Sequence, residues 1–139
     1  MIIYLDENIP PHLAKGFNII QAPENLKKGR VKLEVKYLPE VFGFGIADLD
    51  WIPKVGAEKS CVITQDIHIS KRKDEVQAYI DNGVGLFFLR GASKKNGLSV
   101  WEMVQILAKN WEDIIEIVLK EDGAFAYTVQ QKRKISRYK

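Results

Sequence analysis

The chain has 139 residues, a net charge of +3, 46% hydrophobic residues and 28% charged residues, which are ordinary values for one globular domain. No apolar run approaches the about 20 residues of a membrane helix, which excludes a helical integral membrane protein. An acidic pair follows residue 5 where a signal peptide would be basic, so we expect a cytoplasmic protein without membrane contact. The single Cys61 excludes an internal disulfide. Because it lies in an apolar stretch, we expect a buried, unreactive thiol.

Basic residues are concentrated at the C-terminus. The last eight residues, KRKISRYK, hold five of the 21 Lys and Arg, so the rest of the chain has 16 basic against 18 acidic side chains. We therefore predict one domain over residues 1–131 and a basic tail over residues 132–139. Such a tail favours an anionic partner such as nucleic acid, and a solvated, frayed terminus is the alternative.

Strand and helix patterns alternate along the chain. Short apolar or β-branched runs predict strands at 1–5, 35–38, 61–64, 85–89 and 124–129. Helical patterns occur at 9–15, 48–59, 74–81 and 99–119. The alternation predicts an α/β fold, in which a central, mostly parallel sheet lies between two layers of helices in a three-layer α/β/α sandwich.

The segment after the first helix is the hardest to interpret. Gly16 is expected to end that helix. Residues 17–20 then have the composition of a short strand, and residues 24–30 that of a charged loop. Residues 43–47 (GFGIA) also indicate a loop, because glycine favours turns.

Local signals predict where the later helices begin. Pro53 is tolerated only in the first turn of a helix, which favours Asp50 over Asp48 as the N-cap. Ser99 and Glu102 have the spacing of a capping box at the start of the longest helix.

Carboxylates follow several of the predicted strands. Asp6 comes directly after the first strand, and Asp66 lies just past Thr64, the last residue of a later strand. Parallel neighbouring strands lie about 4.8 Å apart, so these carboxylates would project from one edge of the sheet. Ligands of open α/β sheets bind at that edge. Asp48 and Asp50 lie where a loop enters a helix, again beyond the carboxyl end of a strand.

Carboxylates gathered at one edge repel each other, and a fold retains them where a divalent cation offsets their charge. Mg²⁺ and Mn²⁺ take hard oxygen ligands, and such a site can activate water against a phosphodiester. For any single acid, a helix cap or a solvated turn is the alternative. We rank Glu7 below Asp6 as a candidate metal ligand, because successive side chains of an extended chain point to opposite sides. His68 is a candidate base or outer-shell group, although most loop histidines are neither.

Basic side chains also follow the predicted strands, which places them near the acids if the strands are parallel. Lys and Arg contacts to phosphate give salt-dependent affinity for nucleic acid with little sequence preference. The candidates are Lys71, Arg72, Lys73, Lys94, Lys95, Lys132 and Arg133.

Three stretches carry a resemblance to a known family. LDENIP at residues 5–10, GIADLDWIP at 45–53 and VITQD at 62–66 resemble the motifs of PIN-like ribonucleases. The resemblance extends over about residues 1–90 and is nearest to the VapC-type toxins of bacterial toxin–antitoxin pairs.

The resemblance implies an α/β/α sandwich with an acidic pocket that binds Mg²⁺ or Mn²⁺ and cleaves RNA. Position by position, it implies catalytic, metal-binding roles for Asp6, Asp48 and Asp66, and pocket-lining roles for Asn8 and Thr64. Many PIN domains have a further acid a few residues past Asp66, where this chain has Ile67-His68-Ile69. Glu7 or Asp50 would complete the metal site in its place.

The sequence therefore predicts a metal-dependent endoribonuclease, the toxin of a pair neutralised by an antitoxin protein. Apolar residues on more than one face of helix 99–119 predict a homodimer or partner surface. Two alternatives remain open. A receiver-type phosphoacceptor module also ends parallel strands on acids and would be labelled by beryllofluoride. A non-catalytic module would bind nucleic acid in a salt-dependent way that a chelator does not change.

Overall fold

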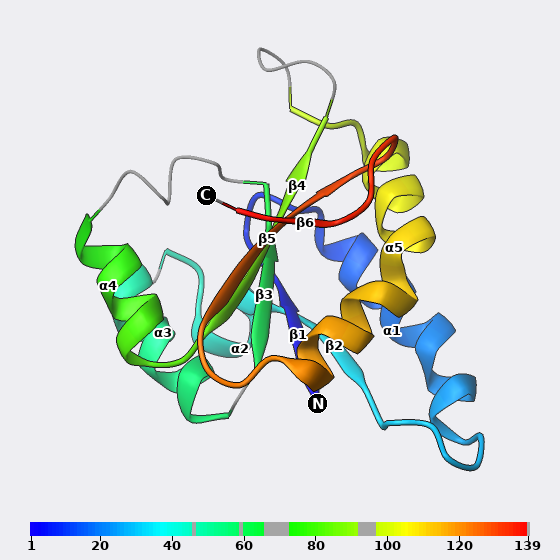
Figure 1. Cartoon of the computed structure of the whole chain (residues 1–139), viewed down its shortest axis with the longest axis horizontal. Helices are drawn as coiled ribbons and strands as arrows, with labels where there is room; N and C mark the ends of the chain where they lie inside the picture. Colours follow the sequence, from blue (N-terminus) through cyan, green and yellow to red (C-terminus); the bar gives the residue numbers. More distant parts are fainter. Residues whose placement is uncertain (46, 59, 66–72, 92–96, 139) are drawn as a thin grey trace.

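The computed structural model describes residues 1–45, 47–58, 60–65, 73–91 and 97–138. These residues form one sheet with helices on both of its faces (Figure 1). The strands are β1 (Ile2–Leu5), β2 (Glu34–Tyr37), β3 (Cys61–Thr64), β4 (Gly85–Arg90), β5 (Phe125–Gln130) and β6 (Ser136–Arg137). The helices are α1 (Pro11–Asn25), α2 (Leu38–Phe42), α3 (Asp48–Ala57), α4 (Lys73–Asp81) and α5 (Val100–Lys120).

The sheet has the strand order β2-β1-β3-β4-β5-β6. β1 to β5 are parallel, and only β6 runs antiparallel to its neighbour β5. The predicted central, mostly parallel sheet is therefore confirmed. The chain moves from β1 to β2 on one side and then returns to β3 on the other side of β1. The strand order thus switches at β1 and β3, and the crevice beyond their carboxyl ends is where such sheets bind ligands.

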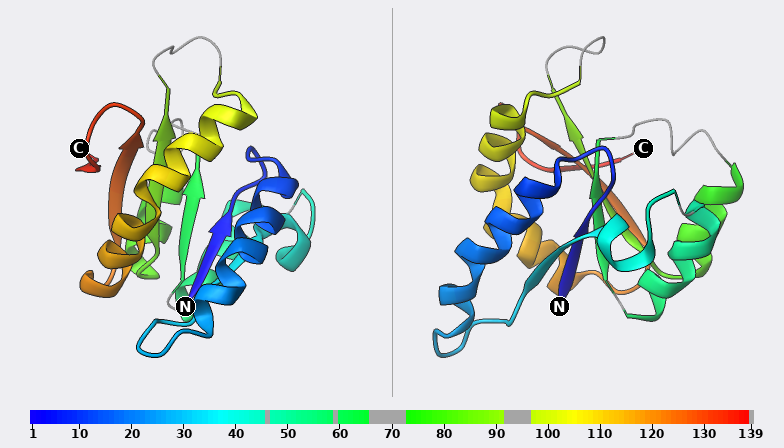
Figure 2. Two further views of the ribbon diagram at one scale, coloured as in Figure 1. Left: turned by 90° about the vertical axis from the view of Figure 1, so that its right-hand side faces the viewer. Right: turned by 180° about the vertical axis from the view of Figure 1, so that it is seen from behind.

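Two hydrophobic layers cover the two faces of the sheet. α1 and α5 lie on one face, and α3 and α4 lie on the other (Figure 2). Alternate residues of each strand supply the two layers, because successive side chains of a strand point to opposite faces. Ile3 and Phe87 are buried on the α1/α5 side, whereas Tyr4 and Phe88 are buried on the α3/α4 side. This confirms the predicted three-layer arrangement.

The first helix is longer than predicted. It continues through Gly16 and includes the four following residues, for which the predicted strand is wrong. Packing against α5 explains the difference, since the rings of Phe17 and Trp111 lie 4.8 Å apart and Trp111 Nε1 donates a hydrogen bond of 3.1 Å to Gln21. A glycine inside a helix costs about 1 kcal/mol, which such tertiary packing exceeds.

The third helix begins earlier than the position of its single proline suggested. The prediction of Asp50 as N-cap is wrong, because α3 begins at Asp48 with Ala47 as the N-cap, and Asp50 N donates to Ala47 O at 2.9 Å. Pro53 therefore lies inside the helix and has no N–H for the carbonyl of Leu49. Leu49 is 53% exposed, so it lies on the side of the helix where water can hydrogen-bond to that carbonyl.

The start of α5 follows the prediction. Ser99 Oγ accepts a hydrogen bond of 3.2 Å from Glu102 N, and Ser99 N donates one of 3.0 Å to Glu102 Oε1. This hydrogen bond from the backbone of Ser99 lowers the pKa of Glu102. The capping box is thus confirmed. The short helix α2, by contrast, was not predicted.

Part of the predicted basic tail belongs to the sheet. Ser136 and Arg137 form β6, and Tyr138 N donates a hydrogen bond of 3.0 Å to Ala126 O. The ring of Tyr138 lies 4.8 Å from the buried ring of Phe88 on the α3/α4 side. The division of the chain at residue 131 remains a prediction. Among the described residues, none of the helices has the length and apolar character needed to cross a membrane.

Two helical glycines give opposite expectations for substitution by alanine. At Gly16, no described atom beyond its own stretch of helix lies within 4 Å of an added Cβ, so Gly16→Ala should raise the free energy of unfolding by about 0.5–1 kcal/mol. At Gly56, an added Cβ would lie 2.3 Å from the backbone oxygen of Asn82. Gly56→Ala should therefore lower the free energy of unfolding by about 1–3 kcal/mol, because α3 must move away from the end of α4. Urea unfolding of both variants measures the difference, and changes of the same sign would contradict it.

Candidate functional site

Asp6 lies at the switch point, directly after the last residue of β1. Its backbone N donates to Ile63 O at 3.0 Å, which extends the pairing of β1 with β3 by one residue. The side chain is buried, and the residue is 7% exposed. Asp6 Oδ1 accepts a hydrogen bond of 2.7 Å from Glu7 N, and Oδ2 accepts one of 2.9 Å from Thr64 Oγ1. Both carboxylate oxygens are therefore held in a fixed orientation.

Asn8 connects the loop after β1 to the end of β3. Its Oδ1 lies 3.3 Å from Thr64 Oγ1 and accepts a hydrogen bond of 3.3 Å from Gln65 N. The side-chain amide of Gln65 donates to the backbone carbonyl of Asn8. The hydroxyl of Thr64 carries one proton for two acceptors, and the shorter distance is the one to Asp6. Asp6, Asn8 and Thr64 thus form one hydrogen-bonded cluster.

The cluster faces the α3/α4 side of the sheet. Tyr4 and Val62 are buried on that side, and Asp6 and Thr64 follow each of them by two residues, so they point the same way. α3 covers this face and returns the chain to the amino end of β3. A helix of ten residues rises about 15 Å, so Asp48 at its first position lies toward the carboxyl edge that carries Asp6.

The structure describes only some of the other acids that were predicted for the site. Asp66 and His68 lie outside the described residues, and for Asp48 only the backbone at the start of α3 is described. Glu7 and Asp50 are exposed to solvent. Within the described part of the chain, no three His, Cys, Asp or Glu side chains come together as a metal site would require. The roles of Asp48, Asp66 and His68 therefore remain predictions.

Three of the predicted basic residues are described, and all three are exposed. Lys73 begins α4, and Lys132 and Arg133 follow β5. Because β5 is parallel to β1 and β3, Lys132 and Arg133 lie beyond the same edge of the sheet as Asp6. Four further candidates fall outside the described residues: Lys71, Arg72, Lys94 and Lys95.

Tyr37 is a neighbour of the cluster that sequence reasoning missed. It is the last residue of β2 and pairs with Leu5, and its hydroxyl donates to Glu7 O at 3.3 Å. Burial, and then the charges of Glu7, Asp6 and Glu40, raise the pKa of Tyr37. Tyr37 also stands at the end of a strand, so the rule that identified Asp6 as a site residue could have identified Tyr37 as well.

Arg90 also lies at this edge of the sheet. It ends β4, and its guanidinium lies 5.8 Å from the ring centre of Tyr138. Its Nε is buried and has no hydrogen-bond partner among the described residues. Arg90 follows Phe88 by two residues, so it points to the same face as Asp6 and Thr64. A buried guanidinium N–H at this edge is suited to an anionic group.

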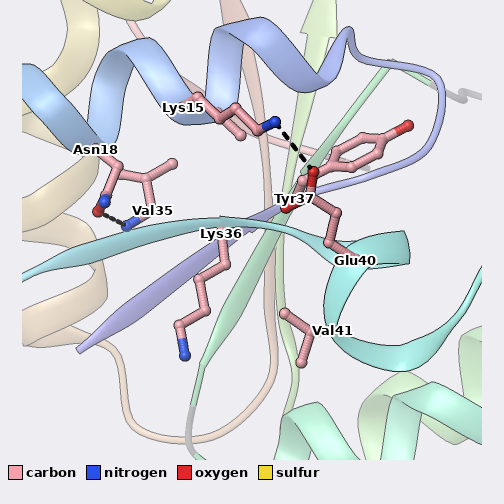
Figure 3. Close-up of a pocket in the computed structure, with 8 residues that line it drawn as sticks. Lys15, Asn18, Val35, Lys36, Tyr37, Glu40 and Val41 are labelled. Atoms are coloured by element: carbon pink, nitrogen blue, oxygen red, sulfur yellow. Dashed lines mark hydrogen bonds and ion pairs between the residues drawn. The ribbon is translucent and has the colours of Figure 1, made fainter.

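A hollow of about 320 Å³ lies between α1, β2 and α2 (Figure 3). Lys15 Nζ and Glu40 Oε1 approach to 3.6 Å across it, and Asn18 Oδ1 accepts a hydrogen bond of 2.9 Å from Val35 N. The hydrogen bond to Asn18 gives a partner to the backbone N–H of Val35, which belongs to the edge strand β2. Tyr37 borders the hollow with its backbone, while its ring points toward the loop after β1 (Figure 3).

The cluster offers only oxygen donors at its centre: a carboxylate, an amide oxygen and a hydroxyl. These suit a hard divalent cation such as Mg²⁺ or Mn²⁺ better than a soft metal. Cys61 lies on the opposite, α1/α5 side of the sheet and is 1% exposed, and burial raises its pKa to about 12. The predicted burial of the thiol is therefore confirmed, and a raised pKa disfavours the reactive thiolate.

Comparisons with known proteins support the same fold. A family described as PIN like domain matches residues 1–91 of the 139 in the chain, a stretch that includes the whole Asp6 cluster. Searches among curated proteins and among solved structures each found no match. The family match covers more than half of the chain, and the α/β sandwich with its mostly parallel sheet agrees with it, so the chain belongs to the PIN-like domain family.

Proposed function

We propose that the protein is a divalent-metal-dependent endoribonuclease whose site is built on Asp6. The observation that supports this most is the geometry of Asp6 itself. Its carboxylate is buried at the switch point of a parallel sheet, and Glu7 N and Thr64 Oγ1 fix its two oxygens at 2.7 and 2.9 Å. A carboxylate held in this way is suited to bind a cation at the edge where α/β folds bind ligands. Membership of a family that often contains nucleases supports the same function.

Asp6 would hold the metal together with Asp48 and Asp66. Asn8 and Thr64 would orient the ligands or the water. The metal, Mg²⁺ or Mn²⁺, would supply Lewis acidity toward a phosphodiester and an activated water. The chain's own part is to hold the Asp6 carboxylate rigid, which lowers the reorganisation that binding requires.

Exposed basic residues support RNA as the polyanionic substrate. Lys132 and Arg133 lie beyond the carboxyl edge, and Lys73 begins the helix that follows β3. Arg90 adds a partly buried guanidinium on the face of the sheet to which Asp6 points. Lys71, Arg72, Lys94 and Lys95 belong to the same proposal through their positions in the sequence. Contacts of this kind to phosphate predict affinity that falls steeply with salt.

We further propose that the protein acts as the toxin of a toxin–antitoxin pair and forms a homodimer. The resemblance of its motifs to the VapC-type branch supports the first part. Val100 and Trp101 are 47% and 76% exposed at the start of α5. These exposed apolar side chains support a contact between this chain and a second protein chain. Sedimentation of the purified chain, alone and with the product of a neighbouring small gene, tests both parts.

The function is tested by incubating the purified chain with single-stranded RNA and Mg²⁺ or Mn²⁺. We expect cleavage that EDTA stops, and a melting temperature that rises as the metal is titrated in, because binding to the native state stabilises it. RNA binding without cleavage, unchanged by EDTA, would instead support the non-catalytic module. Labelling of an aspartate by beryllofluoride, without RNA cleavage, would support the receiver-type module.

A further inference from the structure

The C-terminal strand β6 and the residue after it are anchored on both faces of the sheet. On the α1/α5 side, Arg137 Nη2 lies 2.6 Å from Glu121 Oε1, and the Arg137 guanidinium lies 5.0 Å from the ring centre of Tyr127. On the α3/α4 side, the ring of Tyr138 lies 4.8 Å from that of Phe88. Consecutive residues of an extended chain point to opposite faces, so two neighbouring residues supply the two anchors. The end of the chain therefore has a fixed position on the sheet.

Arg90 is a charged neighbour of the Tyr138 ring. Its guanidinium lies 5.8 Å from the ring centre, within the distance at which a cation is attracted to an aromatic face. Arg90 Nε is buried and has no hydrogen-bond partner among the described residues. A guanidinium stays charged, and a buried N–H without an acceptor costs free energy, so this group is suited to an anion that supplies the acceptor. The Tyr138 ring limits the positions that the guanidinium can take.

The register of the strands places Arg90 near the Asp6 cluster. Phe88 pairs with Thr64, and the pairing of β1 with β3 brings Asp6 into the same row across the sheet. Arg90 follows Phe88 by two residues on the same face. With strands about 4.8 Å apart and a rise of about 3.3 Å per residue, the Cα atom of Arg90 lies about 8 Å from that of Thr64 and about 12 Å from that of Asp6. The guanidinium thus borders the proposed metal site without belonging to it.

We propose that Tyr138 is a positioning residue that holds the Arg90 guanidinium ready for a phosphate of the RNA substrate. The proposal rests on the proposed ribonuclease function and specifies which groups hold the substrate beside the metal. Arg90 offers N–H donors in a planar fork that matches phosphate oxygens, and the Tyr138 ring keeps this fork oriented before the RNA arrives. Because Arg90 lies two strands away from Asp6, it holds a phosphate other than the one at the metal. The end of the chain is then part of the substrate site.

The surroundings of Arg90 favour a chain of phosphates over a single free anion. Lys132 and Arg133 are exposed between β5 and β6, beyond the same edge of the sheet as Arg90. Arg90 pairs with Gln130, so Lys132 follows by two residues the position opposite Arg90. Several cations along one edge match the repeating charge of nucleic acid.

The first part of the test measures RNA binding and does not require cleavage. Fluorescence anisotropy with a labelled single-stranded RNA, with Ca²⁺ in place of Mg²⁺, is repeated over a range of salt concentrations. In Arg90→Gln we expect Kd to rise about tenfold and the slope of log Kd against log salt to fall by about one. Arg30→Gln is the matched control, because Arg30 is exposed just before β2, at the opposite, amino edge of the sheet. Its Kd should change less than about twofold, since salt screens charges that far from the RNA.

The second part separates positioning from packing by two substitutions of Tyr138. Kd should rise about three- to fivefold in Tyr138→Leu and stay within about 1.5-fold in Tyr138→Phe, because either aromatic ring attracts a cation. In the Arg90→Gln background, Tyr138→Leu should change Kd no further, as a double-mutant cycle shows for residues that act together. Where RNA is cleaved, KM should rise in Arg90→Gln and Tyr138→Leu while kcat stays the same, because Arg90 holds a phosphate that does not react.

The proposal is overturned if Tyr138→Leu weakens RNA binding as much in the Arg90→Gln background as alone, or if Tyr138→Phe binds as weakly as Tyr138→Leu. A normal Kd and salt slope in Arg90→Gln would also overturn it, and would leave the proposed nuclease function intact. A melting temperature that rises with millimolar inorganic phosphate, except in Arg90→Gln, without a change in RNA affinity would assign Arg90 to a free anion instead. A chain that cuts no RNA but shows the coupling between Arg90 and Tyr138 in binding would overturn the nuclease function alone.

Discussion

Replacing Asp6 by Asn should lower metal-dependent RNA cleavage by at least about hundredfold while the protein still folds. Loss of a residue that only supports a metal ligand costs about 10- to 100-fold, so loss of a central ligand should cost more. Asn keeps the shape of the side chain, and its amide oxygen can still accept from Glu7 N while its NH₂ donates to Thr64 Oγ1, in place of the bonds of 2.7 and 2.9 Å. The free energy of unfolding without metal should therefore change by less than about 1 kcal/mol.

Asp122→Asn is the matched control for this substitution. Asp122 is exposed in the loop that leads into β5, at the amino edge of the sheet and far from Asp6. Cleavage rates at several Mg²⁺ concentrations and the metal-dependent rise in melting temperature should be lost in Asp6→Asn and unchanged in Asp122→Asn. An Asp6→Asn variant that cleaves RNA at the normal rate, or whose melting temperature still rises with Mg²⁺, would rule out Asp6 as a metal ligand.

Trp51→Ala should give the largest loss of stability among the substitutions considered, about 3–5 kcal/mol. Trp51 is 1% exposed in α3, and its ring lies 5.8 Å from that of Tyr79 in α4, so its removal leaves a cavity beneath both helices. Domains of this size are stable by about 5–15 kcal/mol, so this loss is a large part of the total free energy of unfolding. The substitution also removes one of the three buried apolar side chains, Trp51, Ile52 and Val55, by which α3 packs onto the sheet.

Trp101→Ala tests whether burial, rather than loss of a tryptophan, causes this effect. Trp101 is 76% exposed on α5, so its substitution should change the free energy of unfolding of the monomer by less than about 0.5 kcal/mol. Urea unfolding followed by far-UV circular dichroism measures both variants without relying on tryptophan fluorescence. Similar losses in the two variants would show that Trp51 contributes no more than a surface residue.

Local sequence patterns determined most of the fold. The apolar runs ending at Leu5 and Thr64 were recognisable as strands, because parallel strands are buried on both faces and therefore read as unbroken apolar runs. The capping box of Ser99 and Glu102 needs only residues three apart, so the start of α5 was also predictable. Alternation of the two patterns then gave the sheet with helices on both faces.

Only the tertiary structure decided the features that depend on distant contacts. α1 continues past Gly16 because Trp111, far along the chain, packs against Phe17 and hydrogen-bonds Gln21, and no local rule contains that interaction. Gly43 and Gly45 predicted a loop, but not that its Phe44 would contact Tyr37 beside the site.

The Asp6 cluster combines both kinds of information. The sequence placed Asp6 and Thr64 each at the end of a strand, which is a local property. Their hydrogen bond of 2.9 Å requires β1 and β3 to be neighbours in register, with Leu5 opposite Ile63, although the two residues are 58 positions apart. Register is fixed by the packing of alternate side chains into the two layers, because a shift by one residue would exchange the two faces of a strand. The sequence by itself therefore determined which residues stand at the edge of the sheet, and only the folded sheet decided which of them meet.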